Sequence, residues 1–513
     1  MESFRLQFNT GYRNPDTQQL DLSPSQSSLI VAILSLGCIF GALLSAPVAD
    51  FCGRRKGLII AIAVFNLGVV LQVAATNIPT LLAGRYFAGM GVGAVSLLIP
   101  LYLSETAPKY CRGTMVCAYQ LFITLGLLSA SAINMITQKL TTSAAYRIPM
   151  GLQLTWAFVL SLGLCILPET PRYLVKRGLR DSAALSLSRL RRLDITHPAL
   201  LEELAEIEAN HEYELALGGD TYKDIFVGQP RLGLRTLTGC GLQMLQQLTG
   251  VNFIMYYSTT FFQGAGVPDA FLISLIINIV NVFSTIPGVL VIESWGRRKL
   301  LMVGAIGMAV SQLLIASFTT AAPVSLQITS NQISVGVAAV YICFFASSWG
   351  PTVWVISSEI YPLKVRAKCM SVSTASNWLF NFAIAYGTPY MVGEGPGNAD
   401  LGPKIFFIWG AACVVAVVFV YFMVFETSGV SLEQVDELYE RVQHAWNSKG
   451  FEPSWSFQQL RDLGYSDSGI PPQDLELEHS STTQSSHTGG TGTTTSASDN
   501  KMLATMGNVD FSY

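Results

Sequence analysis

Residues 53–56 read Gly-Arg-Arg-Lys, and the same four residues return at 296–299, an offset of 243 positions. A second pattern, Ser-Glu-x-x-Pro-x-x-x-Arg, occurs at 104–112 and again at 358–366, an offset of 254. A Glu-Thr pair then recurs at an offset of 257. Because the landmarks recur in one order and at nearly one offset, the sequence predicts two homologous halves in the same orientation.

The composition excludes an ordinary water-soluble protein. Half of the residues are hydrophobic and 13% are charged, whereas soluble chains carry about 25% charged residues. Of the 65 charged residues, 20 lie in 169–231 and 17 in 426–513, which leaves 28 for the other 362 positions. A membrane-spanning helix needs roughly 20 apolar residues, and helices satisfy their backbone groups in lipid within one segment. Eleven ranges meet this length, and they are 28–48, 57–76, 81–104, 114–137, 151–168, 236–262, 270–291, 300–320, 334–357, 370–392 and 405–425.

Lysine and arginine in the short connections predict the orientation. Eleven of these residues lie in the loops on one side and three in the loops on the other, and the basic side faces the cytoplasm. The N-terminus of this chain is then exterior. We expect a polar exterior segment 1–27, an N-terminal bundle of five spans 28–168, a cytoplasmic linker with amphipathic helices 169–231, a C-terminal bundle of six spans 232–425, and a cytoplasmic tail 426–513 that its composition predicts to be disordered from about 466.

The repeat also predicts that the first half lacks one helix. Two spans, 236–262 and 270–291, precede the second Gly-Arg-Arg-Lys, but only 28–48 precedes the first. Shifting 236–262 back by 243 positions falls partly before residue 1, onto a polar segment that cannot span a membrane. We therefore expect a six-plus-six protein of which eleven spans are present, through either a truncated gene model or a genuine short variant.

Uncharged polar side chains inside the spans are the candidate binding groups, because such groups are costly in lipid. Gln243, Gln246 and Gln247 share one helical face, and Gly250 weakens the helix beyond them. Asn377 and Asn381 must also face one way. Amides donate and accept hydrogen bonds without charge, which suits a neutral ligand with many hydroxyl groups. Hydrogen bonding between helices is the alternative role. The other polar groups in spans are Gln120, Asn134, Gln153, Asn252, Tyr256, Tyr257, Asn278 and Asn281, and the candidate aromatic platforms are Trp354 and Trp378.

The sequence lacks the signals of several other functions. A net charge of −3 gives no reason to expect nucleic-acid binding, and the nine cysteines include no Cys-x-x-Cys pair that would predict a metal site. Gly89, Gly91 and Gly93 imitate part of a nucleotide-binding fingerprint, but no strand precedes them, so close helix packing is the better interpretation. No phosphate-binding loop with a lysine occurs either, and we expect no nucleotide partner and no cofactor.

The basic clusters 54–56 and 297–299 admit two roles. They are typical anchors of membrane topology. Beside Asp50, Glu105 and Glu359 they could also form ion pairs that close a cytoplasmic gate, and the presence of the same acid and base set in both halves favours the gate.

Several longer motifs follow one another along the chain, namely Asp50-x-x-Gly53-Arg54-Arg55, Arg85-x-x-x-Gly89-x-Gly91-x-Gly93 leading into Pro100-x-Tyr102-x-x-Glu105-x-x-Pro108-x-x-x-Arg112-Gly113, Pro168-Glu169-Thr170-Pro171-Arg172, Gln246-Gln247-x-x-Gly250-x-Asn252-x-x-x-Tyr256-Tyr257, and Gly350-Pro351-x-x-Trp354-x-x-x-x-Glu359. Over about 25–440 the chain thereby resembles the sugar porter family of the major facilitator superfamily, most closely its fungal hexose transporters. The resemblance implies an all-α major facilitator fold of two parallel-repeat helix bundles.

The resemblance also implies roles for individual residues. In proton-coupled members the arginine matching Arg85 pairs with an aspartate of the first helix, so Arg85 is the candidate for proton coupling. One departure is 425–429, where Phe replaces the proline of the family's Pro-Glu-Thr-x-Gly. The positions that contact sugar in the family are Gln120, Gln243, Gln246, Gln247, Asn252, Asn281, Trp354, Asn377 and Trp378. The positions of its cytoplasmic charge network are Asp50, Arg54, Arg55, Glu105, Arg112, Glu169, Glu293, Arg297, Arg298, Glu359 and Arg366.

We expect a multi-pass protein of the plasma membrane that carries a monosaccharide, a hexose such as glucose, by alternating access and without enzymatic chemistry. Its partners are the sugar, the lipid bilayer and, if the intact protein is a symporter, protons. A transporter-like sugar sensor that signals through the Ser/Thr-rich tail is one alternative. The other is an inactive form, because an absent helix would open the cavity to lipid.

Overall fold

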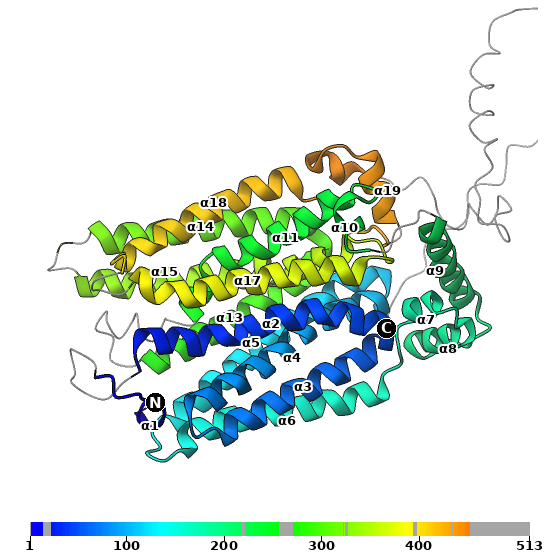
Figure 1. Ribbon diagram of the computed structural model, residues 1–513. Helices are drawn as coiled ribbons and strands as arrows, with labels where there is room; N and C mark the ends of the chain where they lie inside the picture. The colour runs from blue at the N-terminus through cyan, green and yellow to red at the C-terminus, as the bar shows by residue number, and fades with distance from the viewer. Residues whose placement is uncertain are drawn as a thin grey trace, which may run out of the picture. The chain divides into compact units, whose positions relative to one another are not determined.

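The computed structural model of the chain describes residues 2–13, 22–216, 221–255, 270–321, 323, 327–392, 398–432 and 434–451. Long helices lie side by side as one bundle (Figure 1). In the first half they are α2 (Pro24–Cys52), α3 (Arg54–Ala74), α4 (Ile78–Thr106), α5 (Arg112–Thr137) and α6 (Ala144–Ile166). In the second half they are α11 (Leu232–Leu248), α13 (Ala270–Trp295), α14 (Arg297–Ala321), α15 (Gln327–Phe344) with its continuation through η3 (Phe345–Trp349) into α16 (Gly350–Glu359), α17 (Arg366–Val392) and α18 (Ile405–Met423).

Short elements lie at the two ends of the bundle. One end carries α1 (Glu2–Phe8), which packs Phe4 and Phe8 against Tyr146 of α6. The opposite end carries most of the others (Figure 1). The remaining short elements are η1 (Lys109–Cys111), α7 (Pro171–Lys176), α8 (Arg180–Arg191), α9 (Pro198–Ala216), α10 (Asp224–Val227), η4 (Gly402–Lys404), α19 (Gln434–Arg441) and η5 (Ala445–Gly450).

Nine helices in the described ranges are long and apolar enough to cross a membrane. They coincide with nine of the eleven predicted spans. The other two, 236–262 and 370–392, correspond to α11, which has 17 residues, and to α17, which has 27 residues and many polar side chains. The total of eleven therefore stays a prediction. Helix α11 is one residue short of the length required of a span, and polar side chains lower the hydropathy of α17.

Close helix packing explains the Gly-x-Gly-x-Gly run of α4, as predicted. A Cβ at Gly89 would lie 2.1 Å from the carbonyl oxygen of Leu34 on α2, and one at Gly91 would lie 2.5 Å from Cβ of Phe65 on α3. Gly93 meets α2 in the same way. Only residues without a side chain allow three backbones to approach this closely.

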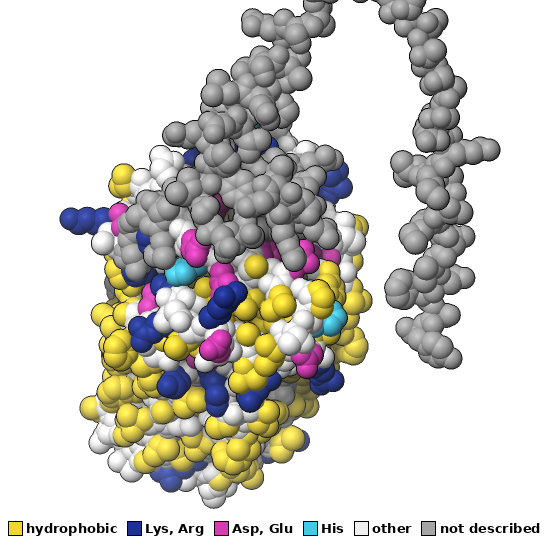
Figure 2. Space-filling model, turned by 90° about the vertical axis from the view of Figure 1, so that its right-hand side faces the viewer, with side chains coloured by type: hydrophobic (Ala, Val, Ile, Leu, Met, Phe, Trp, Pro, Cys, Tyr) yellow, Lys and Arg dark blue, Asp and Glu magenta, His cyan; other side chains and the backbone are white. Residues whose placement is uncertain are grey.

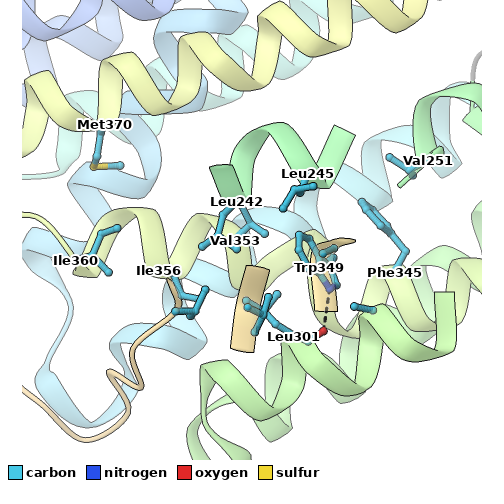
Figure 3. Close-up of a cluster of buried hydrophobic side chains, with 14 of the residues drawn as sticks. Leu242, Leu245, Val251, Leu301, Phe345, Trp349, Val353, Ile356, Ile360 and Met370 are labelled. Atoms are coloured by element: carbon cyan, nitrogen blue, oxygen red, sulfur yellow. Dashed lines mark hydrogen bonds between the residues drawn. The ribbon is translucent and has the colours of Figure 1, made fainter. Parts of the chain in front are cut away.

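The two halves meet mainly along two helix pairs. Helix α2 packs along α17, and α5 packs along α13. The largest apolar core includes residues of both halves, such as Leu58 and Leu97 of the first half. In the second half, Leu242 and Leu245 of α11 point toward Trp349 and Val353 (Figure 3). The indole Nε1 of Trp349 donates to the carbonyl of Leu301 on α14 over 2.9 Å. Leucines of α11 are thus held by apolar packing against this part of the chain.

The region that was predicted as the linker contains short helices. Helices α7, α8 and α9 bury a small core of their own against one another, with Ala183, Leu187 and Leu204 nearly inaccessible to solvent. Arg191 donates to Glu203 over 2.6 Å and to the carbonyl of Thr106, the last residue of α4. The linker helices are therefore attached to the end of the bundle that carries the Gly-Arg-Arg-Lys motifs (Figure 1).

Candidate functional site

Three glutamines of α11 form the centre of a buried amide cluster. Gln243, Gln246 and Gln247 are all buried, as the one-face prediction requires. The Nε2 of Gln246 donates to the carbonyls of Trp349 and Gly350, over 2.9 and 3.2 Å. The side-chain oxygen Oε1 of Gln246 accepts in turn from Nε2 of Gln247 over 3.3 Å. The point where η3 passes into α16 is therefore bound directly to the amides of α11.

Asparagines of α17 complete the cluster. Asn377 donates to Oε1 of Gln243 over 2.7 Å and to Oε1 of Gln246 over 2.9 Å. Asn381 donates to Oε1 of Gln247 over 3.2 Å, and Asn252 donates to the same oxygen. The prediction that Asn377 and Asn381 face the same way is confirmed. Uncharged donors and acceptors from α11, α16 and α17 thus converge on one place between the helices.

The helix breaks at Gly250, as its sequence suggested. Gly250 has φ of +90°, and a Cβ there would lie 2.7 Å from Trp409 of α18. The carbonyl freed at Thr249 accepts from Nε2 of Gln312 over 3.1 Å and from the hydroxyl of Tyr341 over 3.0 Å. These bonds replace those lost by the helix, because buried backbone carbonyls need partners. The next predicted residues, Tyr256 and Tyr257, lie outside the described residues.

The other predicted sugar positions lie on α5, α13, α16 and α17. Gln120 of α5 is buried beside Gly350, where a Cβ would lie 3.2 Å from its Nε2. Asn281 of α13 is buried, and its Oδ1 has no hydrogen-bond partner among the residues described. Trp354 of α16 packs edge-on against Tyr119 of α5 at 5.5 Å between ring centroids. Trp378 of α17 donates to the hydroxyl of Ser96 on α4 over 3.0 Å.

Not all intramembrane amides join this cluster. Asn278 of α13 donates to Ser131 of α5 over 2.8 Å and to the carbonyl of Ser274 over 2.9 Å. It therefore has the alternative role of holding two helices together. Asn134 and Gln153 are half-buried on α5 and α6.

A buried charge network lies at the end of the bundle where α2 turns into α3. Arg54 is 1% exposed and donates to Glu105 over 3.1 Å. Glu105 also accepts from the hydroxyl of Thr170 over 2.7 Å. The carboxylate of Glu169 accepts from the backbone N–H groups of Arg54 and Arg55, over 2.9 and 3.1 Å. All of these contacts stay within the first half.

The second half repeats this network residue by residue. Arg297 donates to Glu359 over 3.0 Å, and the hydroxyl of Thr427 donates to Glu359 over 2.7 Å. Glu426 accepts from the backbone N–H groups of Arg297 and Arg298, over 2.9 and 3.0 Å. The three sequence landmarks of the repeat therefore mark equivalent positions in space.

The backbone conformation and the lack of space explain why each Gly-Arg-Arg-Lys motif begins with glycine. Gly53 and Gly296 have φ of +98° and +83°, a conformation that favours glycine. A Cβ on Gly53 would lie 2.4 Å from Glu169, and one on Gly296 would lie 2.5 Å from Glu426. Each carboxylate sits at the N-terminus of the following helix, where free N–H groups attract anions. Burial raises the pKa of Glu169, and hydrogen bonds from these N–H groups partly offset that effect.

The predicted gate arginines take different roles. Arg55 donates to the carbonyls of Leu164 and Cys165, and Arg298 donates to that of Tyr421, so both hold the last carbonyls of a helix in their own half. Arg366 donates to the carbonyl of Tyr361 over 3.0 Å. Arg112 is buried at the start of α5, and Arg85 is half-buried on α4.

Two carboxylates join the halves at this end. Glu293 of α13 pairs with Arg297 over 2.7 Å and accepts from the backbone N–H of Thr114 on α5 over 3.2 Å. Asp50 of α2 pairs with Lys176 of α7 over 3.3 Å, and Lys176 also donates to the carbonyl of Lys364. Positive and negative side chains intermingle on the surface of this end (Figure 2).

Sequence reasoning missed several members of these sites. Glu426 is equivalent to Glu169, and the recurring Glu-Thr pair was the signal that could have assigned it. Asp436 of α19 binds the fully buried Arg235 of α11, whose guanidinium lies 4.3 Å from the ring centroid of Tyr439. No local pattern marks that contact, because its partners are 201 residues apart.

Two repeated halves, a charge network at one end and uncharged amides at the centre define a membrane carrier of the major facilitator type. The same fold occurs in the proton:xylose symporter XylE bound to 6-bromo-6-deoxy-D-glucose, with a TM-score of 0.75 and 26% identity over 86% of this chain and 94% of that one. A family model described as "Sugar (and other) transporter" matches residues 3–439. The chain belongs to this sugar transporter family.

Fungal relatives are more similar in sequence. The chain is 59% identical to a Neurospora crassa protein named probable glucose transporter rco-3, over 100% of this chain and 92% of that protein. It is 42% identical to the high glucose sensor RGT2 of Saccharomyces cerevisiae, over 83% of this chain and 57% of that protein.

Proposed function

We propose that this protein carries a monosaccharide, a hexose such as glucose, across a membrane by alternating access. The observation behind the proposal is the cluster of buried, uncharged amides on α11 and α17 at the broken helix, in a chain of the sugar transporter family. Sugar hydroxyl groups both donate and accept hydrogen bonds, so they can take the place of amide partners without adding charge.

Gln246 is assigned the central sugar contact, with neighbours from both halves around it. Asn281 supplies a buried acceptor for a sugar hydroxyl, because its Oδ1 has no partner among the described residues. Trp354 and Trp378 supply aromatic faces. The remaining sugar contacts we assign are Gln120, Gln243, Gln247, Asn252 and Asn377.

The charge networks act as the cytoplasmic gate in this proposal. Contacts such as Glu293 with Thr114 and Lys176 with Lys364 join the two halves, so they must break for the halves to rock apart. Five spans before the linker and six after it move as separate bundles. The similarity to a proton:xylose symporter supports proton coupling, with Arg85 as its candidate residue, and we assign the protein to the plasma membrane.

Uptake of radiolabelled glucose by a yeast strain without hexose transporters tests the proposal. Gln246→Ala should lower kcat/KM by about tenfold or more, because it removes several buried hydrogen bonds. Gln72→Ala is the matched control, since Gln72 is an equally buried amide that donates to backbone carbonyls of α3 and α4. The proposal would be contradicted if the protein neither took up nor bound any of the hexoses and pentoses tested.

A sugar sensor is the second candidate function, and the similarity to RGT2 favours it. Deleting residues 452–513, which follow η5, separates the two. A carrier should keep its uptake after the deletion, whereas a sensor should keep sugar binding and lose its signal.

A further inference from the structure

The hydrogen bonds of the amide cluster all run in one donor-to-acceptor direction, because no amide in it can turn over. Amide oxygen and nitrogen are similar in size, so an isolated amide can turn over at little cost. Gln246 cannot, because its Nε2 faces the carbonyls of Trp349 and Gly350, which only accept. Its Oε1 must then face donors, and those donors are Nε2 of Gln247 and Nδ2 of Asn377. The backbone of α16 thus sets the orientation of every amide behind it.

The chain of hydrogen bonds extends to the other half of the molecule. With Nε2 of Gln247 used, its Oε1 accepts from Asn381 over 3.2 Å. Asn381 therefore turns its Oδ1 toward α2, and this oxygen needs a donor. The hydroxyl of Ser35 supplies it over 2.7 Å. One unbroken series of donors thus runs from Ser35 in the first half to the carbonyls of Trp349 and Gly350 in the second.

Ser35 differs from its neighbours in how it uses its hydroxyl. Ser45 of the same helix is equally buried and donates to its own helix, at the carbonyl of Ala42 over 2.7 Å. Serine hydroxyls within helices can donate in this way to a carbonyl of the preceding turn of their own helix. The Ser35 hydroxyl instead leaves α2 and meets Asn381, 346 residues away in the sequence, where both side chains are less than 5% exposed.

We propose that Ser35 and Asn381 are positioning residues for sugar binding. They hold the Gln247 amide in the orientation that the carbonyls of Trp349 and Gly350 set through Gln246, so that its donors and acceptors meet the sugar hydroxyls in one arrangement. Because Ser35 belongs to α2 and Asn381 to α17, the arrangement depends on contact between the two halves. The inference rests on the proposed function, since it names residues that support the proposed sugar site.

Sugar affinity of the purified full chain, followed by tryptophan fluorescence during glucose titration, tests the inference. Ser35→Ala should raise the Kd by about fivefold to tenfold, the effect of one buried hydrogen bond. Ser35→Thr keeps a hydroxyl and should bind close to wild type. Ser45→Ala is the matched control, with the same substitution on the same helix, and should leave the Kd unchanged.

A double-mutant cycle separates positioning from a structural effect. In a Gln247→Ala background, Ser35→Ala should add little to the Kd, because the effect passes through Gln247. Thermal unfolding should be similar for Ser35→Ala and Ser45→Ala. If Ser35→Ala does not fold, Asn381→Leu serves in its place with the same expectation for the Kd.

The outcomes distinguish the two proposals. If wild type binds glucose and Ser35→Ala binds equally well, or if Ser45→Ala weakens binding as much, the positioning role is wrong and the sugar site stands. If wild type binds no sugar, the proposed function fails and the positioning role fails with it.

Discussion

The two charge networks share an inner core and differ at their outer carboxylate. In each, a buried arginine meets a glutamate that also accepts from a threonine, and a second glutamate binds the N-terminus of the following helix. Arg54 and Glu105 are both in the first half, and Arg297 and Glu359 are both in the second. The inner contacts therefore hold each half rigid, and they do not need to break when the halves move.

The outer carboxylates are Asp50 and its equivalent Glu293, and each reaches a different partner. Asp50 meets Lys176 of the linker helix α7, whereas Glu293 meets the backbone of Thr114 on α5. Two copies of one structural unit are therefore joined by unequal contacts. One outer contact passes through the linker, and the other passes directly from half to half.

Removing one inner glutamate should have the largest effect. Glu105→Gln removes the buried counter-charge of Arg54 and leaves it only the partly exposed Asp50, 3.5 Å away, which should lower the free energy of unfolding by about 3–5 kcal/mol. Glu359→Gln should cost a similar amount, because Arg297 then keeps only the partly exposed Glu293. Chemical unfolding of the purified variants measures both. A large loss in one variant beside a wild-type value in the other would contradict the equivalence of the two cores.

A change at Asp436 should affect the second half alone. Asp436→Asn removes the carboxylate that Arg235 meets at the base of α11, and a hydrogen bond to a charged group is worth about 1.5–3 kcal/mol. The loss should be smaller than for Glu105→Gln, because Arg235 keeps the ring of Tyr439 and the carbonyl of Ile360. Protease digestion should show α19 released first. An α19 that stays protected would argue against the contact.

The outer carboxylates should shift conformation more than stability. Asp50→Asn and Glu293→Gln should each change the free energy of unfolding by about 1 kcal/mol, since both side chains are partly exposed. Labelling of a cysteine placed at Thr114 should increase in Glu293→Gln and change less in Asp50→Asn. Equal labelling in both variants would mean that the two outer contacts are interchangeable.

The smallest effect should come from a surface pair of the linker. Arg180 is 71% exposed and lies 3.0 Å from Glu208. Exposed ion pairs contribute about 0–1 kcal/mol, so Glu208→Gln should change the free energy of unfolding by less than about 0.5 kcal/mol. The variant is therefore the reference for Glu105→Gln. A loss of several kcal/mol here would show that glutamate removal alone, and not burial, explains the larger effects.

Much of this arrangement could be predicted from local pattern. The recurrence of Gly-Arg-Arg-Lys predicted equivalent positions, because one structural unit needs the same glycine and the same acid and base in both copies. The spacing of Gln243, Gln246 and Gln247 predicted a shared face, since helix geometry fixes it. The glycine run of α4 predicted close packing for the same reason.

Other contacts could not be found in this way. A serine such as Ser35 is common in membrane helices, and nothing nearby in the sequence distinguishes it from Ser45. The roles of Arg55 and Arg298 were also undetermined, because an arginine beside acidic residues can as well hold helix-end carbonyls, as these two do.

Membrane helices, two related halves and the helix faces that carry amides or charges could all be predicted from the amino-acid sequence. The helices and their faces depend on residues less than about two helical turns apart, whose geometry the backbone fixes, and the two halves are evident because motifs recur at offsets of 243 to 257 positions. The hydrogen-bond partner of each amide, and the carboxylate that contacts the opposite half, are known from the tertiary structure alone. Those choices depend on how distant helices pack, and side chains separated by hundreds of residues meet only after that packing is complete.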